Sequence, residues 1–240
     1  MSDSSLRSEP DLAEKPSRRR HWWRWALAGL LALVVILVVA VVAFVKLQPS
    51  QPPLALPAAA VAAPVGALDG TWRVGTGSVA GFRIRESFLV IGNDVTGRTS
   101  DVTGTTVLTG TQVVRATFQV SLDAITVDGK TRQPQLVQSL ETAAYPVATV
   151  TLAQPVPLPA AFTSGATITR TAAATLTLHG TTRPVTVTLS ARRDGSAIEV
   201  AGSLPVAFAD YGIKGPRGYG IFGSLASNGT AEFLLVLARA

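Results

Sequence analysis

The feature that most constrains this chain is an uninterrupted apolar run at residues 25–45, WALAGLLALVVILVVAVVAFV. The run holds 21 residues without a charge or a proline. As an α-helix rising about 1.5 Å per residue it covers roughly 30 Å, the thickness of the hydrocarbon core of a bilayer. A helix also satisfies its own backbone hydrogen bonds, as a lipid-exposed segment must. The run therefore predicts one transmembrane helix.

The charges on either side of this run predict its orientation. A basic cluster of Lys15, Arg18, Arg19, Arg20 and Arg24 lies before it, whereas Lys46 alone follows directly. Positive charge favours the cytoplasmic side. We therefore expect a cytoplasmic basic tail at residues 1–24, a single pass through the cell membrane, and an extracytoplasmic C-terminal domain.

A cleaved signal peptide is the alternative interpretation of the apolar run. The apolar core of a signal peptide holds roughly 7 to 15 residues and precedes a cleavage site of small residues. This run is longer and ends in FVKL at residues 44–47. We therefore favour an uncleaved anchor.

A linker rich in proline and alanine is predicted at residues 46–68. Residues 48–67 carry no charge and include five prolines. Proline removes backbone donors and favours extended backbone. The segment is typical of a semi-rigid spacer, which at about 3.1 Å per residue would reach roughly 60 Å.

Residues 69–240 are predicted to form an all-β domain. Apolar and polar residues alternate with a period of two at 113–122, 148–152, 174–178 and 185–189, so one face of each strand is dry. Turn signals lie at Asp128-Gly129, Asp194-Gly195 and Asn228-Gly229, which favours antiparallel hairpins. Only one short helix, within residues 133–142, interrupts the pattern. Seven to nine strands fit either a sandwich or a barrel.

Several kinds of chemistry are absent from the sequence. The chain has no cysteine, so it forms no disulfide and no thiolate metal site. His179 is the single histidine of the β domain, which excludes a multi-histidine metal site; we interpret it as a turn residue. No serine lies in a nucleophile-elbow motif. We predict neither an enzyme nor a cofactor.

Two further patterns are also weak signals. GYGIFG at residues 218–223 matches a dinucleotide-binding motif, but strand-forming residues follow it instead of a helix, so the match is spurious. Residues 69–240 hold 14 Lys and Arg against 11 acids, a net charge of only +3, so no nucleic acid is expected as a partner.

The order of short motifs along the β domain resembles the YceI-like family. They are TWRV at 71–74, SVAGFRI at 78–84, VTGR at 95–98, LDAI at 122–125, YP at 145–146, LTLHGTTRPV at 176–185 and FADYGI at 208–213. The resemblance spans residues 70–238. One departure is that Arg132 is followed by Gln133, where family members commonly carry aspartate. Most members are soluble, so the membrane anchor is an added feature.

The resemblance implies an antiparallel, eight-stranded, lipocalin-like barrel with a short helix, whose interior holds an isoprenoid or another long-chain lipid. Eight strands close a barrel just wide enough for one small ligand or for its own side chains. Strand parity then gives the candidate lining of that cavity: Phe82, Ile84, Phe118, Val120, Leu122, Val150, Leu152, Leu176, Leu178, Val187 and Leu189.

Two alternatives remain open at this stage. The same inward residues would line a barrel that is filled by its own core and serves as a non-catalytic envelope scaffold or adhesion module. Basic residues at the loops, namely Lys130, Arg132, Arg183, Lys214 and Arg217, would either meet a ligand head group or lie in solvent. The sequence favours a membrane-anchored lipid-binding protein.

Overall fold

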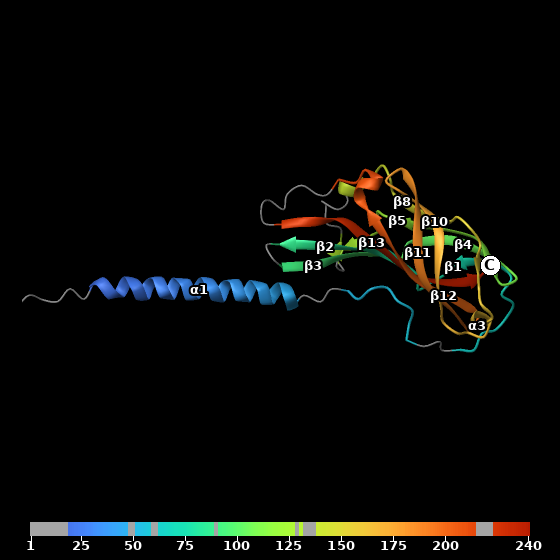
Figure 1. The fold of residues 1–240 in the computed structure, drawn as a ribbon, viewed down its shortest axis with the longest axis horizontal. Coiled ribbons are helices and arrows are strands. Elements are labelled where there is room, and N and C mark those ends of the chain that lie inside the picture. Colours follow the sequence, from blue (N-terminus) through green and yellow to red (C-terminus); the bar gives the residue numbers. More distant parts are fainter. Residues whose placement is uncertain are drawn as a thin grey trace, which may run out of the picture. The chain divides into compact units, whose positions relative to one another are not determined.

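The computed structural model of the chain describes residues 19–47, 51–58, 62–88, 91–127, 130–131, 138–214 and 223–240. The chain forms two compact units, residues 1–48 and 49–240, which are described separately. In the first unit, α1 (Arg19–Leu47) extends beyond the apolar run at both ends (Figure 1). Its segment Trp23–Ala43 has a mean hydropathy of 3.2, and none of it is buried within the protein. The helix is therefore long and apolar enough to span a membrane.

The second unit is a closed antiparallel barrel of eight strands. The strands and short helices are β1 (Gly70–Val74), β2 (Val79–Phe88), β3 (Ile91–Thr99), β4 (Val102–Thr109), β5 (Gln112–Ser121), β6 (Thr126–Val127), β7 (Lys130–Thr131), β8 (Val147–Leu152), β9 (Val156–Pro157), α3 (Ala160–Thr163), β10 (Ile168–Leu178), β11 (Thr181–Asp194), β12 (Ala197–Ala207), η1 (Phe208–Tyr211) and β13 (Gly223–Arg239). The ring of hydrogen-bonded neighbours runs β1-β4-β5-β8-β10-β11-β12-β13 and returns to β1. The predicted barrel is confirmed, and the sandwich is excluded because the sheet has no open break along this ring.

The longest strand, β13, joins two parts of the sheet. Its C-terminal end pairs with β1, as in Trp72 opposite Arg239, and its earlier residues pair with β2, as in Val79 opposite Leu234. Strands β1 and β2 therefore follow one another along the same side of β13. Strand β3 pairs with β2, and the short β6 and β7 extend this edge (Figure 1).

The turns agree only in part with the sequence signals. His179 and Gly180 form the turn between β10 and β11 with φ angles of 51° and 71°, which is typical of a type I′ hairpin. Asp194 pairs with Ala197, so Gly195 begins the next two-residue turn, as expected. The hairpin turn expected at Asn228-Gly229 is wrong, because both residues lie inside β13 next to a shift of register. Asp128-Gly129 lies outside the described residues.

Two other sequence signals fall partly outside the described residues. Of the helix expected within residues 133–142, the described part is helical at 138–140. Of the glycine-rich motif at 218–223, only Gly223 is described, and it begins β13. The helical turns α3 and η1 have no clear sequence signal.

The linker does not behave as a free spacer in its described residues, because it lies against the barrel. The Nη2 atom of Arg83 donates to the carbonyl of Gln51 at 2.7 Å, and the Ala62 N–H donates to the Asp194 carboxylate at 2.7 Å. The Nη2 atom of Arg193 donates to Val65 O at 2.8 Å. The proline-rich backbone has few donors but keeps its carbonyls, which suit arginine side chains. The expected reach of roughly 60 Å is therefore not available to this segment while these bonds hold.

Two of the three hydrophobic clusters line the two ends of the barrel interior. One contains Trp72, Phe162 and Leu237, near α3. The other contains Leu176, Leu204 and Tyr211, near η1. Leu189 and Phe233 are partly buried and contact both clusters. Apolar side chains thus line most of the inner face of the barrel.

Candidate functional site

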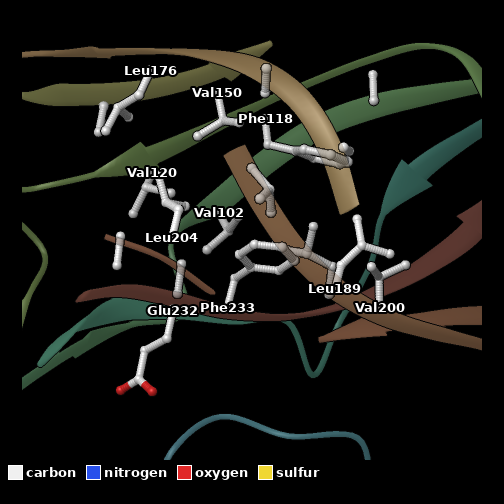
Figure 2. A pocket seen from close by; sticks show the side chains of 18 of the residues that line it. Val102, Phe118, Val120, Val150, Leu176, Leu189, Val200, Leu204, Glu232 and Phe233 are labelled. Atoms are coloured by element: carbon white, nitrogen blue, oxygen red, sulfur yellow. The ribbon is translucent and has the colours of Figure 1, made fainter. Parts of the chain in front are cut away.

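The barrel encloses a cavity of about 260 Å³ between the two clusters. Phe118 and Phe233 project into the same interior space from different strands, with Val102, Leu189 and Leu204 around them (Figure 2). The α3 end of the cavity is bounded by Phe162, which is 1% exposed. A barrel filled by its own side chains would leave no such space, so the interior has room for part of a ligand.

All eleven residues proposed from strand parity lie on the cavity wall. They come from β2, β5, β8, β10 and β11, with Leu122 directly after β5. Their inward placement follows from the period of two in a strand, which puts every second side chain on the same face. Contact of these residues with a ligand stays a prediction.

The prediction from strand parity missed many of the residues that line the cavity. Further lining residues lie on β4, β12 and β13, among them Val102, Leu108, Ile198, Val200, Leu204, Val206, Ala231, Phe233, Leu235 and Leu237. On β12 the alternation is readable in the sequence, whereas on β4 the residues TGTT follow Val102 and show none. On β13 it is hidden, because residues 233–237 read FLLVL and both faces are apolar. The outward-facing residues of β13 contact other parts of the protein or are themselves apolar. Hydrophobicity alone therefore does not show which residues of β13 face inward.

Five described lining residues have polar side chains: Thr106, Ser139, Arg170, Thr230 and Glu232. Glu232 is directed away from the other labelled side chains, toward the outer side of β13 (Figure 2). Arg170 and Thr106 lie on inward-facing positions, between Ile168 and Ala172 on β10 and between Val102 and Leu108 on β4. The cavity is therefore apolar apart from a few polar groups at fixed positions, as in small-molecule sites generally.

His179 joins three segments at the η1 end of the barrel. Its Nδ1 atom lies 2.9 Å from the carbonyl of Tyr211, and its Nε2 atom lies 3.6 Å from the Glu141 carboxylate. Its ring centroid is 4.6 Å from that of Tyr145. In the described part of the chain no serine hydroxyl hydrogen bonds to it, so the contacts describe a structural turn residue.

Tyr211 is buried beside this turn, and its ionisation is perturbed. Burial raises the pKa of the Tyr211 hydroxyl, the nearby Asp210 carboxylate raises it further, and Arg183 opposes the shift.

The basic residues considered as head-group contacts do not reach the interior where they are described. Arg183 is exposed and donates to the Asp210 carbonyl, and Lys214 is exposed. Arg132 and Arg217 lie outside the described residues.

The described residues contain no group of three or more His, Asp or Glu side chains that would hold a metal ion. Three carboxylates of the barrel, those of Asp94, Glu199 and Glu232, are instead paired with arginine, as with Glu199 and Arg192 at 2.7 Å. The arrangement of the cavity wall can enclose an apolar chain.

Comparison with known proteins gives a consistent result for the barrel. The model of the YceI-like domain matches residues 72–233. A solved polyisoprenoid binding domain from Saccharophagus degradans, implicated in plant cell wall breakdown, is similar with a TM-score of 0.53 and 21% identity, covering 71% of this chain and 98% of that one. BcnA from Burkholderia cenocepacia is similar with a TM-score of 0.49 and 15% identity, covering 69% and 95%. Comparison with curated proteins gives no match.

The family model compares the sequence of the chain, and the structural comparison compares its fold. The match to the family model covers more than half of the chain, and the structural similarity covers nearly the whole length of the Saccharophagus domain. Each covers the barrel as the geometry defines it. The chain belongs to the YceI-like family.

Proposed function

We propose that this protein binds an isoprenoid or a similar long-chain lipid inside the barrel, and that α1 holds the barrel on the extracytoplasmic side of the cell membrane. The observation that carries the first part is the apolar cavity of about 260 Å³. The similar domain from Saccharophagus degradans is described as polyisoprenoid binding, which supports the same ligand class here.

The size of the cavity sets how much of a ligand it holds. A cavity of about 150 Å³ accommodates a benzene molecule, so this one has room for about ten carbon atoms. Burying ten carbons would contribute on the order of 8 kcal/mol before the entropic costs of association. A longer chain would extend beyond the cavity or displace side chains. The space argues against the alternative of a filled scaffold barrel.

Photocrosslinking in the membrane tests the binding proposal. The full chain in lipid vesicles is labelled with a diazirine analogue of farnesol, and the modified residues are mapped by mass spectrometry. We expect labels on inward residues of β10 and β11 such as Leu176 and Val187. Labels confined to α1 and the linker would contradict the proposal.

A matched pair of variants on β10 sharpens this test. Ala174 lines the cavity and is 4% exposed, whereas its neighbour Ala173 is exposed on the outer face. Ala174→Phe fills cavity space and should lower barrel labelling several-fold, and Ala173→Phe should leave it unchanged. Equal labelling in both variants would show that the ligand lies elsewhere. Thermal unfolding of each variant controls for loss of the fold.

The topology is tested by cysteine labelling, because the chain has no cysteine of its own. Ala240 is exposed at the C-terminus, and Ser5 lies before the apolar run. In spheroplasts a membrane-impermeant maleimide should modify an Ala240→Cys variant, and should modify a Ser5→Cys variant only after lysis. The reverse pattern would overturn the proposed orientation. A shortened mature chain that lacks residues 1–45 would show cleavage instead of anchoring.

A further inference from the structure

Arg170 is the one arginine among the described residues of the cavity wall. It lies on β10 at the same parity as Ile168, Ala172 and Ala174, which are all buried. Because side chains two apart on a strand share a face, Arg170 projects from the inner face of the barrel. Its side chain is partly buried. A permanent positive charge is thus placed at the edge of an otherwise apolar space.

The strand pairing around Arg170 is one-sided. Strand β8 pairs with β10 only from Ala174 to Thr177, and the next strand, β9, pairs with β5 instead. Among the described residues, β10 at Ile168–Ala172 therefore has a strand partner on the β11 side alone. Arg170 lies at this interruption, where its Nη1 atom donates to the carbonyl of Thr169 at 2.9 Å. Backbone hydrogen bonds of the ladder therefore hold this part of β10 on one side only.

The guanidinium of Arg170 has no anionic partner in the described part of the chain. No described carboxylate lies within 4.0 Å of it, and the bond to Thr169 is its only hydrogen bond to described residues. A guanidinium carries five donors in a planar fork. Most of that donor capacity is therefore free to meet an acceptor from a ligand or from solvent.

Two more deeply buried arginines of the barrel make more hydrogen bonds and ion pairs to the protein than Arg170 does. Arg192 is 4% exposed and pairs with Glu199 at 2.7 Å. Arg193 is 6% exposed and donates to the carbonyls of Val65 and Gly66. Charges removed from water are normally satisfied in this way, because an unpaired one is destabilising. Arg170 makes a single hydrogen bond to the described residues, and it is the arginine that lines the cavity.

A second polar group lies at the same end of the cavity. Thr106 is 5% exposed, and its Oγ1 atom is buried with no hydrogen-bond partner among the described residues. Its inward neighbour Leu108 and the inward neighbour of Arg170, Ile168, belong to the same hydrophobic cluster. Buried hydroxyls are normally hydrogen bonded, so an unpartnered one in a cavity wall indicates a place for a polar ligand atom.

We propose that Arg170 binds the head group of the lipid and that this head group is an oxyanion, a phosphate or a carboxylate. This inference rests on the proposed function and adds the polar part of the ligand. The planar fork of arginine matches both oxyanions in a two-bond geometry. The apolar tail occupies the cavity between Phe118 and Phe233, and the head group lies at the interruption between β9 and β10, with Thr106 facing the adjoining part of the cavity.

Competition against the photoreactive farnesol tests this assignment on the full chain in detergent micelles. The competitors are geranylgeranyl phosphate and geranylgeraniol, which differ only in the head group. A charge-assisted hydrogen-bond pair corresponds to a preference of about 10- to 100-fold for the phosphate. In an Arg170→Gln variant this preference should fall to less than about 3-fold, while geranylgeraniol still competes as in the wild type.

Arg115 provides the matched control, since it is exposed on the outer face of β5 and does not line the cavity. Arg115→Gln should keep the wild-type preference. Equal competition by the two lipids in the wild type, or an unchanged preference in Arg170→Gln, would overturn the head-group assignment and leave the proposed function intact. Competition by neither lipid would overturn both. Displacement of geranylgeranyl phosphate by millimolar inorganic phosphate would show a site for the free anion and would also overturn the assignment.

Discussion

The carboxylate of Glu232 lies 2.7 Å from the guanidinium of Arg98, and the pair is covered although it projects from the outer side of the barrel. Glu232 is 4% exposed and Arg98 11%. Arg83 approaches the same carboxylate at 3.5 Å, and the backbone N–H of Leu54 in the linker donates to it at 3.1 Å. Burial lowers the pKa of Arg98, and the Glu232 charge opposes that shift. The linker is thus fastened to the barrel over a buried ionic cluster.

Neutralising Glu232 should loosen the linker and destabilise the barrel. Glu232→Gln keeps the shape of the side chain but leaves Arg83 and Arg98 without their shared anion. Removing one partner of a buried ion pair costs about 3 to 5 kcal/mol. Urea unfolding of the full chain in detergent should show a loss of this size, and limited proteolysis should cleave the linker near Leu54 faster.

Asp94 offers a control for this prediction. It also pairs with Arg83, at 3.6 Å, but its carboxylate is 31% exposed. Exposed ion pairs contribute about 0 to 1 kcal/mol, so Asp94→Asn should have little effect. A Glu232→Gln variant that is as stable as Asp94→Asn, with an equally resistant linker, would show that the ionic cluster does not hold the linker.

The contacts that hold the linker show which parts of the fold can be predicted from the sequence and which cannot. Inward residues such as Phe118 and Leu176 follow from local alternation, because their faces are set within one strand. Glu232 has the parity of an outward residue and by that rule should be solvated. Its burial depends on Leu54, which is 178 positions away in the chain. Contacts of this length leave no periodic signal, so the sequence alone predicts a free spacer.

Arg170 is not predicted to line the cavity, for a different reason. The alternation that predicts the inward face of β10 begins at Ala174, and extending it by four residues toward the start of the strand would place Arg170 inside. A charged residue is ordinarily assigned to the wet face of a strand, which argues against that extension. The proposed head-group site therefore rests on a departure from the pattern and not on the pattern itself.

Two glycines in β2 and β3 allow these strands to pack closely. A Cβ on Gly97 would lie 2.3 Å from the ring of Phe82, and a Cβ on Gly81 would lie 1.9 Å from the backbone oxygen of Gly97. Gly97→Ala should destabilise the barrel by about 1 to 3 kcal/mol through overpacking. Gly81→Ala should cost more, because a backbone atom cannot rotate away.

A second substitution separates these two cases. Phe82→Leu removes the ring atoms that collide with the methyl group introduced by Gly97→Ala, so it should restore part of the stability of that variant in a double-mutant cycle. The same substitution should give no recovery in Gly81→Ala, whose collision is with the backbone. Thermal unfolding of the two double variants measures both couplings, and equal recovery would contradict the assigned contacts.

Tyr211 predicts a loss of stability at high pH. Its pKa in the folded barrel is raised by burial and then by Asp210, whereas the unfolded chain titrates near the ordinary value of about 10. Below that value both states keep the proton and the contribution is constant. As the pH rises above about 10, the unfolded state loses its proton first, so the free energy of unfolding falls until the folded pKa is passed.

Tyr211→Phe isolates this contribution from the other groups that titrate at high pH. The difference in the free energy of unfolding between wild type and variant should be constant from pH 7 to about pH 9 and should then shift in favour of the variant. Urea unfolding at a series of pH values provides the measurement. A difference that stays constant up to about pH 11, or that shifts in favour of the wild type, would contradict a raised pKa for Tyr211.

The volume of the cavity predicts how affinity depends on the length of an isoprenoid chain. With room for about ten carbons, each carbon buried up to that length should contribute about 0.8 kcal/mol. Geraniol should therefore compete far better than isopentenol for the photoreactive site. After correction for partition into micelles, farnesol and geranylgeraniol should improve on geraniol by less than about 10-fold each, because their added carbons lie outside the enclosed space. In Ala174→Phe the plateau should shift to a shorter alcohol, since the new ring occupies the same volume. Affinity that rises evenly through geranylgeraniol would show that the wall residues move apart to admit the whole chain.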